Sequence, residues 1–387
     1  MGYKIGSFNM RNLGLTSMGK DNLRDLKLIA EIIREEGFDV VALQEVLSEG
    51  KAFISPNYAK KCILMELGGE REWGFEWADA SSKTADNRGE GYAFLWNKRR
   101  LRLTTTKLEN GSIREFKPQM LNNVKSRVMQ RYPYYARFTP QGALGGTNFE
   151  IRLICIHTHY GKNDSHANRA IRQIELDTIM KEIYPQISDK IYKNDMPHYT
   201  IILGDYNAEL WRPWREQNRK RENAELRANG KSPPKMPMCI PDEVVVESSK
   251  WGKRIIIKTV QDKLTTLKSS NDSQQDSGYC AAESHPTELG DISECNIDFE
   301  NMNFQSKIAA EYSSAECRDM FLEETSDSNN CYSRNYDHFS FEEAQFEDVK
   351  WKVKRVNAVR EYCGNDPEKY IKTVSDHVPI MMEINLK

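Results

Sequence analysis

Short apolar segments alternate with polar stretches along the chain, in a pattern that predicts many strands and few helices. Strand-like apolar runs lie at residues 3–9, 38–45, 91–96, 149–157, 199–204, 254–260 and 378–385. Residues 21–36 and about 166–183 instead repeat their apolar positions with the spacing of a helix. The many predicted strands, with a few helices between them, predict a layered α/β sandwich.

Several of the predicted strands run directly into a polar or ionisable residue. These strand-end residues are Asn9, Glu45, His159, Asp205, Asn207, Asp376 and His377. One such acid is most often a solvated turn residue, and one such histidine is most often packed in the core. The hypothesis of a functional site therefore rests on the combination, which would gather at one rim if the strands are neighbours.

These residue types suit the hydrolysis of a phosphoester. Mg²⁺ prefers oxygen ligands, which Glu45 and Asp376 supply. Asp205 suits the task of orienting or deprotonating a water molecule. Histidines with a carboxylate partner can stabilise or protonate phosphate oxygens, and the amide of Asn207 can donate a hydrogen bond to phosphate without adding negative charge.

The motifs around these residues resemble, in the same order, those of the endonuclease/exonuclease/phosphatase superfamily, and most of all its deoxyribonuclease I-like branch. The segments that carry the resemblance are SFNMRNLG, VALQEV, GEGYAFLW, GDYNA, YDHFSF and SDHVPI. The resemblance implies an α/β fold, a four-layer α/β sandwich of two packed mixed, mainly antiparallel sheets flanked by helices, with large insertions. It also implies phosphoester cleavage that depends on Mg²⁺, with Mn²⁺ or Ca²⁺ as alternatives.

The resemblance assigns roles to individual residues. It implies the catalytic residues Glu90, His159, Asp205, Asn207, Asp337 and His377. Glu90 would hold His159, and Asp337 would hold His377. It implies the metal ligands Asn9, Glu45 and Asp376, and the substrate-binding residues Arg11, Arg131 and Thr266. Leu47 and Arg88 depart from the family pattern, at positions where the family carries a groove-reading arginine and an aromatic residue.

Charge is distributed unevenly, although the formal net charge is only −2 and excludes steering of nucleic acid by the protein as a whole. Residues 212–235 hold eight basic residues against three acidic ones, and Trp211 and Trp214 flank the first of them. Arg212 and Arg215 are therefore predicted to contact phosphates, while a solvated basic helix or linker is the equal alternative. Residues 271–330 hold fourteen acidic residues against two basic ones, which predicts a surface for a protein partner or for self-contact.

These observations predict one catalytic domain over residues 1–387, with a basic insertion at 208–250 and an acidic, polar insertion at 268–335. The sequence contains no apolar run long enough to span a bilayer and no basic-then-apolar leader. Its eight dispersed cysteines contain no C-x-x-C pair, which favours reduced thiols. We therefore expect a cytoplasmic protein, with a secreted mature form as the alternative.

The sequence predicts a Mg²⁺-dependent DNA endonuclease or exonuclease, in which metal-assisted water attacks the phosphodiester and two histidines stabilise or protonate its oxygens. The alternative is a phosphatase or phosphodiesterase of the same superfamily, acting on phosphoinositide, sphingomyelin or a small nucleotide. Lipid-cleaving members would be expected to show apolar or amphipathic surface segments, and the polar insertions here favour a nuclease. An inactive scaffold or toxin subunit is the third hypothesis, which the presence of the complete residue set disfavours.

Overall fold

The computed structural model describes residues 2–14, 24–55, 62–80, 89–107, 110–122, 129–142, 149–161, 165–190, 196–210, 224, 227–230, 238–247, 254–260, 266–267, 332–334 and 336–385. Internal contacts divide the chain into two compact units. The first comprises Met1–Trp211, Lys235–Lys268 and Tyr332–Lys387, and the second comprises Arg212–Pro234 and Ser269–Cys331. Almost all described residues belong to the first unit, so the boundaries expected for the two insertions stay predictions.

The first sheet has six strands in the order β19-β20-β1-β2-β4-β3. Their bounds are β1 (Gly2–Leu13), β2 (Val40–Leu47), β3 (Trp73–Asp79), β4 (Glu90–Asn97), β19 (Lys350–Arg355) and β20 (Ile380–Asn385). β1 runs parallel to β2, whereas the other neighbouring strands of this sheet are antiparallel. The sheet is thus mixed and mainly antiparallel.

The second sheet has eight strands, in the order β14-β15-β18-β11-β10-β9-β5 with β8 paired to β9. Their bounds are β5 (Leu101–Leu103), β8 (Gln119–Met120), β9 (Tyr134–Pro140), β10 (Glu150–His157), β11 (His198–Asp205), β14 (Glu243–Glu247), β15 (Arg254–Val260) and β18 (Asp337–Glu342). Here β10 runs parallel to β11, and the remaining pairs are antiparallel.

The two sheets pack face to face through one apolar core. Ile5, Ala42 and Phe94 from the first sheet belong to the same buried cluster as Leu153 and Leu203 from the second. Alternate residues of each strand point to this core, as the pleat of a strand requires. The packing confirms the predicted sandwich of two mixed sheets.

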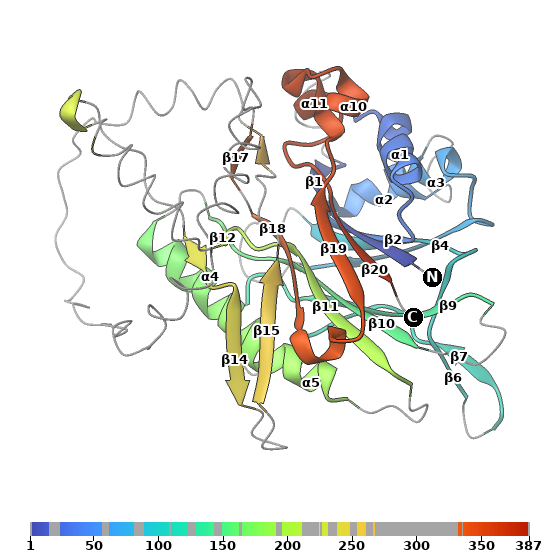
Figure 1. Ribbon diagram of the computed structural model, residues 1–387. Helices are drawn as coiled ribbons and strands as arrows, with labels where there is room; N and C mark the ends of the chain where they lie inside the picture. Colours follow the sequence, from blue (N-terminus) through green and yellow to red (C-terminus); the bar gives the residue numbers. More distant parts are fainter. Residues whose placement is uncertain are drawn as a thin grey trace. The chain divides into compact units, whose positions relative to one another are not determined.

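Helices form the two outer layers (Figure 1). α1 (Leu26–Glu35), α3 (Ile63–Glu66), α10 (Ala358–Cys363) and α11 (Pro367–Thr373) lie beside the six-stranded sheet. α4 (His166–Thr178) continues through a π-helical turn at Ile179–Ile183 into α5 (Tyr184–Ser188), and buries Leu176 and Ile183 against Ile154 and Ile202 of the eight-stranded sheet. Four layers result, as the family resemblance implied.

Shorter elements complete the described fold: a 3₁₀ turn at Ser48–Gly50, α2 (Lys51–Ile54), the hairpin of β6 (Thr105–Lys107) and β7 (Ile113–Glu115), β12 (Glu209–Leu210) with β13 (Cys239–Ile240), β16 (Thr266–Leu267) with β17 (Tyr332–Arg334), and a 3₁₀ turn at Glu343–Phe346. Among the described residues, no helix is both long and apolar enough to cross a membrane. Cys62, Cys155 and Cys363 form no disulfide.

The topology explains why polar residues meet at one edge. β1-α1-β2 and β10-α4-β11 are both strand–helix–strand crossovers, so each parallel pair ends at the same edge of its sheet. The antiparallel neighbours begin where these strands end: β4 begins at Glu90, and β18 begins at Asp337 opposite Asp205. The carboxyl ends of four strands and the amino ends of two others therefore form one rim.

We expect Gly204→Ala to destabilise the protein by about 3 kcal/mol or more, because Gly204 combines a strained backbone with a lack of space. Its φ is +144°, and an added Cβ would collide with the carbonyl oxygen of Ile156. Gly111→Ala is the matched control, since Gly111 has a φ of +81° but nothing within 4 Å of the added atom. Urea unfolding should give a loss of only about 1 kcal/mol for the control. Equal losses in both variants would contradict the steric argument.

Candidate active site

The amide of Asn9 connects the two sheets at the rim. Its Nδ2 donates a hydrogen bond to Glu45 Oε1 at 3.0 Å and another to Asp205 Oδ2 at 3.0 Å. Asn9 and Glu45 lie on β1 and β2 of the first sheet, whereas Asp205 is the last residue of β11 in the second. Three of the predicted site residues are therefore brought together.

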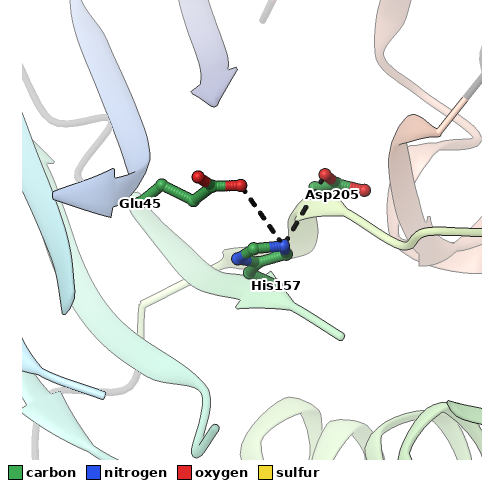
Figure 2. Close-up of side chains that lie close together, drawn as sticks. All are labelled: Glu45, His157 and Asp205. Carbon is green, nitrogen blue, oxygen red and sulfur yellow. Dashed lines mark ion pairs between the residues drawn. The ribbon is translucent and has the colours of Figure 1, made fainter. Parts of the chain in front are cut away.

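The histidine that enters this cluster is His157, not His159. The Nδ1 of His157 lies 2.6 Å from Glu90 Oε1, and its Nε2 lies 3.7 Å from Glu45 Oε1 and 3.8 Å from Asp205 Oδ2. Figure 2 shows the Glu45 and Asp205 carboxylates on either side of this ring nitrogen. The predicted pairing of Glu90 with His159 is therefore wrong by two residues.

The register of β10 explains the difference. β10 ends at His157, which pairs with Asp205 of β11, so His157 still follows the pleat of the strand and points into the site. His159 lies beyond the strand, where its Nε2 contacts Asn168 Oδ1 at 3.1 Å. The apolar run at residues 149–157 already ends at His157, and this was the signal in the sequence.

Arg131 completes the surroundings of the first histidine. Its Nη2 lies 2.7 Å from Glu90 Oε2, so Glu90 binds His157 with one oxygen and Arg131 with the other. Burial opposes the charge of Glu90, but His157 and Arg131 together lower the pKa of Glu90 to about 2. Burial and Arg131 oppose protonation of His157, yet Glu90 and Asp205 raise its pKa above the ordinary value.

The second histidine has the carboxylate partner expected for it. The Nδ1 of His377 lies 2.8 Å from Asp337 Oδ2, and its backbone N–H donates to Ser375 Oγ at 3.1 Å. Its Nε2 lies 3.8 Å from Asp205 Oδ2. Burial opposes protonation, but Asp337, followed by Asp205 and Asp376, raises the pKa of His377 well above its ordinary value. Both histidines thus turn Nε2 toward Asp205.

Asp205 is the centre of the arrangement, and Asn207 supports the turn that follows it. Asp205 Oδ1 accepts the backbone N–H of Asn207 at 2.7 Å. The side-chain amide of Asn207 donates to the carbonyl oxygen of Thr158 at 2.8 Å, which ties the end of β11 to the residue after His157. In this arrangement the Asn207 amide holds two strand ends together, and its predicted contact with phosphate stays a prediction.

Backbone strain is concentrated here. Five described residues other than glycine have a positive φ, and four of them belong to this rim: Arg11 (43°), Asn12 (55°), Glu45 (55°) and Asn207 (47°). The register of β1 with β2 shifts between Asn9 and Leu13, and that of β2 with β4 shifts between Leu43 and Val46, as at a β-bulge. The N–H of Asn12 donates to Glu45 Oε2 at 2.9 Å and so offsets part of the strain. Strained conformations of this kind cluster at functional sites.

The remaining predicted residues lie around the edge of the cluster. Arg11 Nε lies 3.2 Å from Asp376 Oδ2, so this carboxylate is paired with an arginine. Thr266 forms a β-bridge with His377, and the N–H of Leu267 donates to the carbonyl oxygen of Asp376 at 2.7 Å. Arg88, Arg212 and Arg215 lie outside the described residues, so nothing places them at the site.

Two overlapping groups in the cluster have the composition of a metal site. Glu45, His157 and Asp205 form one group, and Asp205, Asp337 and His377 form the other, each with its ligand atoms within 4.8 Å of one another. Burial, together with Glu90 and Asp376, raises the pKa of Glu45, while His157 and the hydrogen bond from Asn9 oppose this shift. The carboxylate oxygens of these groups suit a hard divalent ion, whereas the predicted ligand Asn9 turns its Nδ2 to the carboxylates and its Oδ1 to the backbone N–H of Arg11 at 2.9 Å. The donor set therefore fits a divalent metal.

The described residues thus form a four-layer sandwich with carboxylates and histidines paired at one rim. The profile of the Endonuclease/Exonuclease/phosphatase family matches residues 6–377, so the chain belongs to this family. Members of the family are phosphoesterases and nucleases, which supports enzymatic activity of that type. A comparison with curated protein sequences gives no match to the chain.

Three solved structures illustrate the structural likeness. TDP2 of D. rerio, complexed with a single-strand DNA product, is 12% identical and covers 100% of this chain and 99% of its own, with a TM-score of 0.43. ANGEL2, a 2′,3′-cyclic phosphatase in complex with adenosine-2′,3′-vanadate, is 11% identical over 99% and 95% of the two chains, with a TM-score of 0.45. A family protein from Bacteroides vulgatus is 12% identical over 100% of both chains, with a TM-score of 0.42.

We expect Mg²⁺ to serve as a probe of the donor set, and Glu45→Gln to weaken its stabilisation of the fold, because the substitution removes a formal charge from that set. An ion that binds only the folded state at one hundred times its Kd stabilises that state by about 2.7 kcal/mol. A tenfold loss of affinity removes about 1.4 kcal/mol of this gain. Thermal unfolding with and without MgCl₂ measures this change in stabilisation. The control is Glu347→Gln, because Glu347 is an exposed acid that follows β18. An equal Mg²⁺ effect in wild type and both variants would exclude Glu45 as a ligand.

Proposed function

We propose that the chain is a Mg²⁺-dependent phosphodiester hydrolase that cleaves nucleic acid, and DNA in particular, as an endonuclease or exonuclease. One observation carries the proposal: two buried histidines, each bound to its own carboxylate, turn Nε2 toward the same carboxylate of Asp205. The Nε2 of His157 and that of His377 each lie 3.8 Å from Asp205 Oδ2. A tetrahedral phosphate needs donors on several sides and a base, which this arrangement supplies.

In the proposed mechanism, Asp205 orients the attacking water and accepts its proton. Glu90 and Asp337 bind the Nδ1 atoms of the two histidines, which leaves Nε2 of each protonated ring free to donate to a phosphate oxygen or to the leaving oxygen. Glu45 would hold Mg²⁺, which would neutralise developing charge on the phosphate. The amide of Asn9 orients the carboxylates of Glu45 and Asp205, because its Nδ2 donates to both while its Oδ1 accepts the N–H of Arg11. Arg131 keeps Glu90 in its charged form and in place.

An exposed aromatic side chain beside the site supports nucleic acid as the substrate. Tyr160 follows His157 by three residues, and it is 38% exposed. Its ring lies 6.2 Å from that of Tyr336, the residue before Asp337, and the guanidinium of Arg172 lies 5.1 Å from its centroid. A tyrosine held in this way offers a face on which a base can stack. Phosphoinositide and sphingomyelin headgroups have no flat ring to use it.

The direct test incubates purified protein with Mg²⁺ and a panel of supercoiled DNA, single-stranded DNA, RNA, phosphoinositide, sphingomyelin and small nucleotides. His157→Ala and His377→Ala should each lower the rate by about 10²-fold to 10⁴-fold. His159→Ala should cost much less, since its side chain contacts Asn168 rather than the cluster. Cleavage confined to a non-nucleic phosphoester would replace the nuclease by the alternative. A large loss in His159→Ala with none in His157→Ala would reverse our assignment of the histidine.

Tyr160→Ala should raise the KM for single-stranded DNA about tenfold, because base stacking contributes about 1–3 kcal/mol. Tyr160→Phe, which keeps the ring, should leave the KM close to that of wild type. A series of oligonucleotides, each with one abasic site at a different position, identifies the stacked base. At one position, the abasic site should remove the difference in KM between wild type and Tyr160→Ala. If every oligonucleotide gives the same ratio of KM values, the ring does not bind a base.

A further inference from the structure

A buried acid on α4 binds two loops of the site that are distant in the sequence. Glu175 is 1% exposed. One of its carboxylate oxygens accepts the backbone N–H of Gln130 at 2.7 Å, and the other accepts the backbone N–H of His159 at 2.7 Å. The predicted mechanism gave Glu175 no part, and it touches none of the proposed metal ligands in the described contacts.

Arg172 acts from the preceding turn of the same helix. It is fully buried, its Nε donates to the carbonyl oxygen of His159 at 2.8 Å, and its Nη2 lies 3.4 Å from the carbonyl oxygen of Tyr160. Residues three apart on a helix face the same side. The backbone N–H of His159 therefore donates to Glu175, and its C=O accepts from Arg172. These two contacts restrict the segment after β10.

These contacts form a closed cycle of interactions that includes His157. Gln130 is followed by Arg131, Arg131 pairs with Glu90, and Glu90 binds His157. His159, two residues further on, returns to Glu175. A shift of Glu175 would therefore reach His157 by both routes, through the chain from His159 and through Arg131 and Glu90.

A carboxylate is the group that this position requires. A buried charge costs free energy unless hydrogen bonds satisfy it, and here two backbone donors do so from opposite loops. A glutamine of the same shape has one acceptor oxygen, and its NH₂ group would face the second N–H. We propose that Glu175 is a positioning residue, which sets the place of His157 and its partners Glu90 and Arg131 by joining the 129–131 and 157–160 segments.

The first experiment needs no substrate and tests whether Glu175 joins the 129–131 and 157–160 segments, a connection that we call the clasp. In Glu175→Gln, hydrogen–deuterium exchange followed by mass spectrometry should be faster than in wild type over peptides covering residues 129–131 and 157–160. The control is Asp177→Asn, on the same helix, where the carboxylate is 44% exposed and pairs with Lys181 on the surface. Unchanged exchange in Glu175→Gln would overturn the clasp, whether or not the protein proves to be a nuclease.

The second experiment rests on the proposed function and tests the consequence. Glu175→Gln should lower kcat about tenfold to one hundredfold, in the range seen when a supporting hydrogen bond is removed, while Asp177→Asn keeps the wild-type value. The Mg²⁺ concentration that gives half-maximal rate should not change. The double variant Glu175→Gln, His157→Ala should be no slower than His157→Ala alone, because both changes act through the same cycle of interactions.

Additive losses in the double variant would assign Glu175 a general effect on folding, and an unchanged kcat would deny it a role in positioning. Glu175→Asp keeps the charge but shortens the side chain. Compared with Glu175→Gln, it should restore part of the exchange protection in one of the two loops and little of the lost kcat. If wild type cleaves no phosphoester, the proposed function fails, while the exchange measurement still decides the clasp.

Discussion

One uncharged amide links the two sheets at the rim that carries the site. Asn9 donates to Glu45 of one sheet and to Asp205 of the other, so the packing of the sheets and the geometry of the cluster share the same hydrogen bonds. A lysine or arginine would make similar contacts, but its charge would cancel the negative potential that attracts a cation. The hydroxyl of Ser375 donates to the backbone carbonyl oxygen of Asn9, and the backbone N–H of Arg11 donates to its Oδ1. These two contacts fix the orientation of the Asn9 side chain.

Much of the fold and part of the site could be predicted from the sequence. The run at 149–157 is mostly apolar, as in a strand covered by a second sheet and by helices, and β10 is buried along its whole length. Its two charged residues, Glu150 and Arg152, are paired with each other in the interior. Asn9, Glu45 and Asp205 could be placed together because strand ends that share an edge are a matter of topology. The contact between Asp337 and His377 followed from the family resemblance, and the distance of 2.8 Å agrees with it.

The rest depends on tertiary contacts that local pattern does not encode. Which histidine of His157-Thr158-His159 faces Glu90 is decided by where the ladder between β10 and β11 ends, a difference that resemblance alone did not resolve. Glu175 lies on the buried face of α4 beside Leu176, where an acid interrupts the apolar pattern. Its partners, two backbone N–H groups from distant loops, leave no trace in the composition of the helix.

The pairing of β1 with β20 brings residues from both ends of the sequence to the site. The cluster draws on residues from Asn9 to His377, and β20 is hydrogen-bonded along β1 from Gly2 to Ser7. Contacts of such long sequence separation require the closure of very large loops, so they form slowly and late. A growing chain would therefore carry every early motif yet no assembled centre, and would gain it only when β20 joins β1. The complete cluster therefore exists only once β20 has joined β1 in the first sheet.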